Sequence, residues 1–137
     1  MIRALVVADS GIAMSAVTAK LCRIDALDIV AYASGRARVD HVARLVAPDV
    51  VLVDEMCWPG LALARIAEVR SVAPLAAVIG LTSRTDGEWT AAGLQAGASA
   101  VIPSDLSRET LELVLREVLE ARGRAPEAVR MDERSAA

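Results

Sequence analysis

Five short apolar runs alternate with longer segments of helical periodicity, and this alternation limits the possible fold more than any other feature of the sequence. Three of the runs are apolar at every position, whereas a strand with one face in water would alternate apolar and polar residues. Continuous apolar strands separated by helices are typical of a parallel sheet covered on both faces, that is, of a doubly wound α/β fold. The predicted strands are Ala4–Ala8, Asp28–Ala33, Val50–Val53, Ala76–Leu81 and Ala100–Ile102.

The segments between these runs predict helices near Gly11–Arg23, Arg36–Val46, Leu61–Val72, Asp86–Ala96 and Arg108–Arg122. In the last of them the apolar residues form one stripe, and Leu113 falls on the opposite, wet side, either as a lone surface leucine or as part of a docking surface. The pattern ends at Gly123. We therefore expect one domain over residues 1–122 and a linker or disordered tail over 123–137.

Charge and hydropathy exclude two classes of partner. The formal net charge is −3, and no basic field covers the chain, so we expect no direct contact with nucleic acid. The longest uncharged run, Trp89–Ser104, contains glycine and proline and is too short to span a bilayer. We expect a cytoplasmic protein that does not contact membranes.

Polar residues follow several of the predicted strands. Asp9 comes directly after the first strand, Asp54 after the third, Thr82 after the fourth, and Ser104 near the end of the fifth. The carboxyl ends of parallel strands meet at one edge of the sheet, where ligands bind. Carboxylates and a hydroxyl there could hold Mg²⁺ and a phosphoryl group, and an aspartate could itself be the nucleophile. The alternative for each residue is a simple turn former or helix cap.

The element order and four motifs resemble the receiver domain of bacterial two-component response regulators, over about residues 1–122. The motifs are Val6-Val7-Ala8-Asp9, Pro48-Asp49-Val50-Val51-Leu52-Val53-Asp54, Leu81-Thr82-Ser83 and Gln95-Ala96-Gly97-Ala98-Ser99-Ala100. The resemblance implies a three-layer, flavodoxin-like α/β fold whose five-stranded parallel sheet has the order 2-1-3-4-5.

The same resemblance implies a role for each polar residue at the sheet edge. Asp54 matches the phosphoacceptor, and Thr82 matches the hydroxyl that follows the phosphoryl group and switches the domain. Asp9, Asp54 and the backbone carbonyl of Met56 match the Mg²⁺ ligands. Ala8 stands where the family usually has a second acid, so we expect Mg²⁺ to bind weakly or not at all.

Other departures from the family concern the phosphoryl group and its readout. Ser104 stands where the family usually has the lysine that pairs with the phosphoryl oxygens, and Val101 stands where it usually has an aromatic switch residue. Lys20 is the only lysine of the chain, and we do not expect it to replace the missing one, because it lies on the first predicted helix. The chain thus resembles an atypical receiver.

Three functions remain open from the sequence. The first is a receiver that accepts a phosphoryl group on Asp54 from a sensor histidine kinase and switches an output, transcription regulation through an effector domain outside this chain. Its only catalysis would be self-phosphotransfer and autodephosphorylation on Asp54. The second is a phosphorylation-independent module that acts by docking or by homodimerisation through the last helix and Leu113. The third, an unrelated flavodoxin-like enzyme or small-molecule binder, has no glycine-rich phosphate loop to support it.

Overall fold

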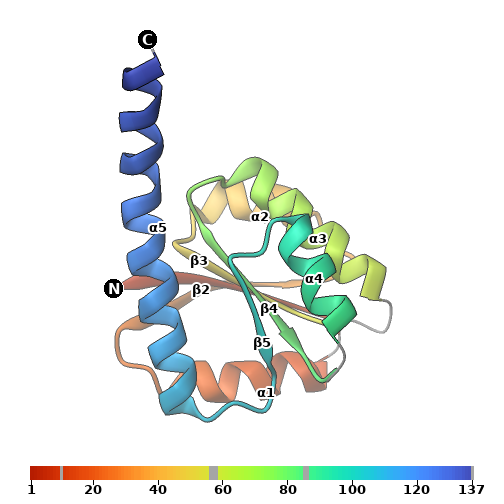
Figure 1. Cartoon of the computed structure of the whole chain (residues 1–137). Helices are drawn as coiled ribbons and strands as arrows, with labels where there is room; N and C mark the ends of the chain where they lie inside the picture. The colour runs from red at the N-terminus through yellow and green to blue at the C-terminus, as the bar shows by residue number, and fades with distance from the viewer. Residues whose placement is uncertain (10, 56–58, 85–86, 137) are drawn as a thin grey trace.

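Strands and helices alternate through the whole chain, as the apolar pattern predicts (Figure 1). The computed structural model describes residues 1–9, 11–55, 59–84 and 87–136. The strands form one parallel sheet in the predicted order β2-β1-β3-β4-β5. They are β1 (Ile2–Ala8), β2 (Leu27–Ser34), β3 (Val50–Asp54), β4 (Ala77–Thr82) and β5 (Ala100–Pro103). The helices are α1 (Gly11–Leu21), α2 (Val39–Val46), α3 (Pro59–Val72), α4 (Gly87–Ala96) and α5 (Arg108–Ala136).

The sheet separates two apolar cores, and successive residues of each central strand point to opposite ones. On β3, for example, Val50 and Leu52 pack with α1 and α5, whereas Val51 and Val53 pack with α2, α3 and α4. This alternation follows from the two-residue period of a strand and explains why the central strands are apolar at every position. It also places Asp54, two residues after Leu52, on the side of the sheet that α1 and α5 cover.

Trp89 of α4 fills the opposite face of the sheet beside β4 and β5, and it is buried. Two glycines make room for this packing. A Cβ at Gly80 would lie 3.2 Å from the ring of Trp89, and a Cβ at Gly93 would lie 2.8 Å from the side chain of Val101. The apolar volume next to Val101 is therefore supplied by an aromatic side chain of α4 rather than by one on β5.

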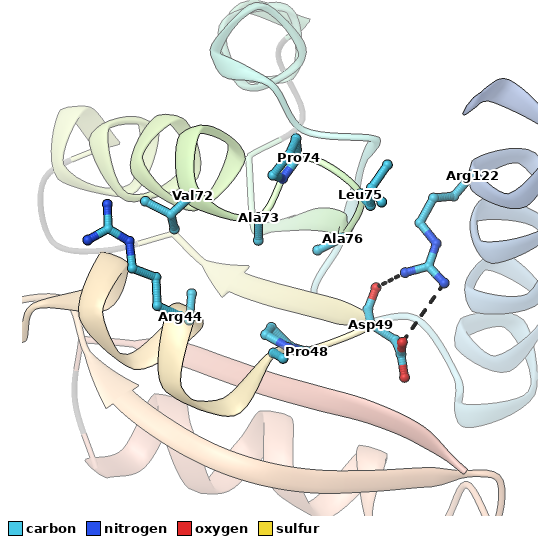
Figure 2. A pocket seen from close by; sticks show the side chains of 11 residues that line it. Arg44, Pro48, Asp49, Val72, Ala73, Pro74, Leu75, Ala76 and Arg122 are labelled. Atoms are coloured by element: carbon cyan, nitrogen blue, oxygen red, sulfur yellow. Dashed lines mark hydrogen bonds and ion pairs between the residues drawn. The ribbon is translucent and has the colours of Figure 1, made fainter. Parts of the chain in front are cut away.

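Helix α5 is tied to the sheet at the edge opposite the predicted site and then continues away from it (Figure 1). Arg122 donates a hydrogen bond to the carbonyl oxygen of Asp49 at 2.7 Å, and its guanidinium lies 4.0 Å from the Asp49 carboxylate (Figure 2). The carboxylate of Asp49 also accepts a hydrogen bond from the backbone N–H of Arg3 at 2.9 Å. The Pro48-Asp49 motif thus joins three elements of the fold.

The helix at the C-terminus is longer than the sequence pattern predicts, since α5 reaches Ala136 instead of ending near Arg122. The added segment is rich in alanine, glutamate and arginine, which have high helix propensity, and it also contains Gly123 and Pro126, which have low propensity. That residues 123–137 form a linker or disordered tail stays a prediction, and the part of this segment that the structure describes, 123–136, belongs to α5. Neither α5 nor any other helix in the described parts of the chain has an apolar stretch long enough to cross a bilayer.

Candidate functional site

The polar residues predicted to meet at the carboxyl edge of the sheet are close in register. Asp54 is the last residue of β3 and pairs with Leu81 of β4, directly before Thr82. The backbone N–H of Ser104 donates to the carbonyl oxygen of Thr82 at 2.9 Å. Val7 is the last residue of β1 that pairs with β3, opposite Val53. Ala8 and Asp9 therefore follow at about the level of Asp54, the last residue of β3, and Glu55. Met56 lies outside the described residues.

Asp54 is half-buried and lines a small cavity of about 170 Å³ between α1, the end of β5 and the start of α5. Burial, together with the negative charge of the neighbouring Glu55, raises the pKa of the Asp54 carboxyl from 3.8 to about 6. Removal from water disfavours the charged form of a carboxyl group, and a second carboxylate disfavours it further. Asp54 is therefore a weaker acid, and as a carboxylate a stronger base, than an ordinary aspartate.

Lys20 enters the same cavity from α1, which corrects the expectation that it lies out of reach of the site. Its ammonium nitrogen Nζ donates a hydrogen bond to the carbonyl oxygen of Ser104 at 2.5 Å. Val17 and Leu21 on the same helix are buried in the core between the sheet and helices α1 and α5, here called the α1/α5 core. This packing directs Lys20 to the loop after β5. The ammonium thus lies beside the residue that occupies the expected lysine position.

Thr82 is engaged by a neighbouring acid that the sequence interpretation did not assign to the site. The Thr82 hydroxyl, in a residue only 5% exposed, donates a hydrogen bond to Oε2 of Glu55 at 2.7 Å. The other carboxylate oxygen of Glu55 accepts from the backbone N–H of Ser83 at 3.0 Å and from the Ser83 hydroxyl. The Thr82 hydroxyl also accepts from the backbone N–H of Arg84 at 2.9 Å.

These hydrogen bonds set the charge of Glu55. Burial alone would raise its pKa, but the hydrogen bonds from Ser83 and Thr82 outweigh burial and, with the charge of Arg84, lower the pKa below its ordinary value. Hydrogen bonds to a carboxylate favour its charged form. Glu55 therefore carries a full negative charge at neutral pH, and the hydroxyl that the resemblance assigns to the phosphoryl group already donates to an anion.

The carboxylates that could hold Mg²⁺ are Asp9 and Asp54. Both supply the hard oxygen ligands that Mg²⁺ prefers. Glu55 is turned toward β4 by its bonds to Thr82 and Ser83, and Ala8 contributes no side-chain ligand. Within the part of the chain that the structure describes, no three histidine, cysteine or acidic side chains gather as a metal site. Carboxylate oxygens are the type of ligand that Mg²⁺ prefers, but these two residues supply fewer of them than a tight site needs.

Sequence analysis assigned no role in this site to two of its residues, Lys20 and Glu55. Each had a signal. Lys20 lies three residues after the buried Val17, so it lies on the flank of the buried side of α1. Asp54 lies an even number of residues after Val50 and Leu52, so its side chain points to the same side of the sheet as theirs, toward α1. Glu55 directly follows the predicted acceptor. Neither signal says where a long side chain ends, because that depends on how the elements pack.

Comparison of the structure with solved structures finds receiver domains of response regulators among the similar structures. No family sequence model and no curated protein matches the sequence. The signal receiver domain of the response regulator NarL from Mycobacterium tuberculosis superposes with a TM-score of 0.75 and 22% identity, over 87% of this chain and 96% of that domain. The BeF₃-activated receiver domain of DrrB superposes with a TM-score of 0.68 and 25% sequence identity, over 88% of this chain and 98% of that domain. NtrX from Brucella abortus superposes with a TM-score of 0.74 and 18% sequence identity, and the match covers 95% of this chain but only 29% of NtrX.

Proposed function

We propose, from the premise that this chain has the fold of response-regulator receiver domains, that it accepts a phosphoryl group on Asp54 in a two-component pathway. The observation that carries the proposal is the half-buried Asp54 carboxylate at the carboxyl edge of the parallel sheet, lining a cavity that an ammonium group also enters. A sensor histidine kinase is the proposed donor. The N–P bond of its phosphohistidine breaks, the imidazole keeps the electron pair, and one Asp54 oxygen forms the new O–P bond.

The residues around Asp54 support this transfer and its reversal. With a pKa of about 6, Asp54 is mainly ionised at neutral pH, and its carboxylate is a stronger nucleophile than a fully hydrated one. Attack of a water molecule on the phosphorus atom would break the bond to the Asp54 oxygen, release inorganic phosphate and restore the carboxylate. The chain would act on no other molecule, so its catalysis would be limited to its own phosphorylation and dephosphorylation.

The direct test is incubation with acetyl phosphate and Mg²⁺, followed by intact-mass measurement. The phosphoryl group leaves acetate and forms a bond to Asp54, which adds about 80 Da to the chain. We expect one such addition. An unchanged mass with acetyl phosphate and with several phosphorylated kinases would overturn the proposal.

Bound Mg²⁺ would neutralise charge on the phosphoryl oxygens as the transfer proceeds. Asp9 and Asp54 would hold it, with the Met56 carbonyl as the proposed third ligand. Because Mg²⁺ gives up its water reluctantly and finds few carboxylates here, we predict a dissociation constant in the millimolar range or above. Titration of tryptophan fluorescence measures it, and binding far tighter than millimolar would contradict this ligand set.

The proposed output is transcription regulation in the cytoplasm through an effector domain that is not part of this chain. The similarity to NtrX supports this, because the matching region makes up only 29% of that longer protein. Residues 123–137 would then form the connection between receiver and effector. Helix α5 leaves the body of the domain in this region, at the edge of the sheet where Arg122 contacts Asp49 (Figures 1 and 2).

A second candidate function is a receiver-like module that works without phosphorylation, and the contact between Glu55 and Thr82 favours it. In this function the Glu55 carboxylate supplies the anion for Thr82 permanently, at 2.7 Å. The loop after β4 would be held in one arrangement whatever the state of Asp54, and the output would come from docking or dimerisation.

Leu113 on α5 is the residue through which we predict homodimerisation. Its side chain is 59% exposed, whereas Leu111 and Leu115 are buried in the α1/α5 core. Charged residues surround it, including Glu112 and Arg116, which pair at 3.4 Å. An exposed apolar anchor with a charged rim is typical of a modest interface.

Replacing Leu113 by glutamate should abolish the dimer without unfolding the chain, because the position lies outside the core. Sedimentation at high micromolar concentration, with and without acetyl phosphate, measures this. A dimer in both conditions supports the phosphorylation-independent module, and a dimer only with acetyl phosphate supports the phosphorylated receiver. A wild-type monomer in both conditions would show that Leu113 is only a surface leucine.

A further inference from the structure

We propose that Lys20 on α1 binds the oxygens of the phosphoryl group carried by Asp54. The inference rests on the proposed phosphorylation of Asp54 and assigns a phosphoryl-binding residue that lies outside the four sequence motifs of the site. It replaces the positive charge that is missing at Ser104, after β5.

The first support is the position of the two side chains on one side of the sheet. The side chain of Asp54 points to the same side of the sheet as those of Val50 and Leu52, which pack against α1 and α5. Lys20 comes from α1. Both residues line the cavity of about 170 Å³, together with Ser104 and apolar side chains of α1, β4 and α5. A group that leaves the Asp54 carboxylate into this cavity therefore enters the space that Lys20 borders.

The second support is the charge of this cavity. Among the described residues that line it, Lys20 is the only basic one, and Asp54 is the only acidic one. The remaining lining is almost entirely apolar, and a charge-assisted contact is stronger where water is scarce. An anion on Asp54 thus has one positive partner within the cavity.

The third support is how the ammonium group is held. One of its three N–H donors is used by the Ser104 carbonyl at 2.5 Å, which anchors Nζ at the end of β5. Among the described residues, no ion pair joins Lys20 to the Asp54 carboxylate. Its other two donors remain for acceptors in the cavity that Lys20 and Asp54 both line, which is the space that phosphoryl oxygens on Asp54 would enter.

The single lysine allows a direct observation without changing any residue of the site. Growth on lysine labelled with ¹³C at Cε marks Lys20 alone and leaves all three N–H donors of its ammonium group in place. Beryllofluoride, a non-covalent mimic of the phosphoryl group on a carboxylate, is then added with saturating Mg²⁺. We expect the Cε resonance of Lys20 to shift on binding, and the shift to vanish in Asp54→Asn. Bound beryllofluoride with an unmoved Lys20 resonance would overturn the proposal.

Substitutions of Lys20 measure how much its contact contributes to beryllofluoride binding. Lys20→Met should weaken beryllofluoride binding about ten-fold, and Lys20→Arg should weaken it less, because the arginine keeps the charge. The matched control is Arg23→Met, which removes one positive charge from an exposed position just after α1 and should change binding less than about two-fold. Equal binding by Lys20→Met and Arg23→Met would show that Lys20 only ties α1 to the loop after β5.

The two proposals fail in different ways. A wild-type protein that binds beryllofluoride as tightly as its Lys20→Met variant excludes the role of Lys20 and leaves the phosphorylation of Asp54 standing. A wild-type protein that takes up neither beryllofluoride nor a phosphoryl group excludes both. Urea unfolding of each variant establishes that the changes in binding are not changes in folding.

Discussion

Replacing Asp54 by asparagine is expected to abolish phosphoryl uptake and, at neutral pH, to make the protein more stable. The pKa of Asp54 is raised from 3.8 to about 6 in the folded protein, so the folded state binds the proton more tightly than the unfolded state does. Stability therefore falls as pH rises between about 4 and 6, and above that range the buried charge is a cost. A shift of this size corresponds to about 3 kcal/mol, which solvent screening of a half-buried group reduces to about 1–2 kcal/mol.

Urea unfolding at neutral pH and below about pH 4 measures the stability effect. We expect Asp54→Asn to gain stability at neutral pH and to match the wild type in acid, where both side chains are neutral. The control is Asp28→Asn on the exposed side of β2, which should change stability by less than about 0.5 kcal/mol at either pH. A loss of stability at neutral pH would mean that Asp54 makes a favourable contact in the fold. Retained phosphate on the variant would point to a different acceptor.

Replacing Glu55 by glutamine is expected to increase the affinity of Asp54 for beryllofluoride by about ten-fold or more. The substitution removes the negative charge next to Asp54, which contributes to its raised pKa. It also replaces a charged acceptor of the Thr82 hydroxyl by a weaker, neutral one, so that this hydroxyl can donate to the incoming anion. The pKa of Asp54 should move back toward 3.8 in the same variant.

Beryllofluoride titration and ¹³C NMR of the aspartate carboxyl groups measure the two effects. Glu117→Gln is the matched control, because it changes the net charge by the same amount at an exposed position on α5. Unchanged affinity in Glu55→Gln would show that Glu55 does not compete for Thr82. If Glu55→Gln binds beryllofluoride and the wild type does not, the Glu55 carboxylate prevents anion binding at Asp54. The phosphorylation-independent function would then be the better description of the native chain.

The pH dependence of phosphorylation follows from the same two carboxyl groups. Asp54 must be ionised to attack, so its uptake of a phosphoryl group should rise as pH increases through about 6 in the wild type. Glu55 remains ionised over this range, since hydrogen bonds from Ser83 and Thr82 hold its pKa below the ordinary value. In Glu55→Gln the rise should therefore occur at lower pH.

The sequence alone determined the order and position of the elements. Strands buried on both faces must be apolar at every position, so Val50–Val53 and its neighbours stand out without any knowledge of their partners. The predicted strands differ from the observed ones by two residues or fewer at their ends, β1 starting at Ile2 instead of Ala4. The convergence of Asp54 and Thr82 followed in turn, because parallel strands place their carboxyl ends at one edge.

Only the tertiary structure decided what surrounds Asp54. The contact of Lys20 with Ser104 joins residues 84 positions apart, and that of Glu55 with Thr82 joins residues 27 positions apart. Long side chains can reach several partners from one backbone position, and the choice depends on the crossing of α1 over the sheet and on the competing donors at each loop. The periodicity of a sequence reports which face of an element is buried, since burial is a property of each residue. It does not report which two polar groups meet, since that is a property of the packing between elements.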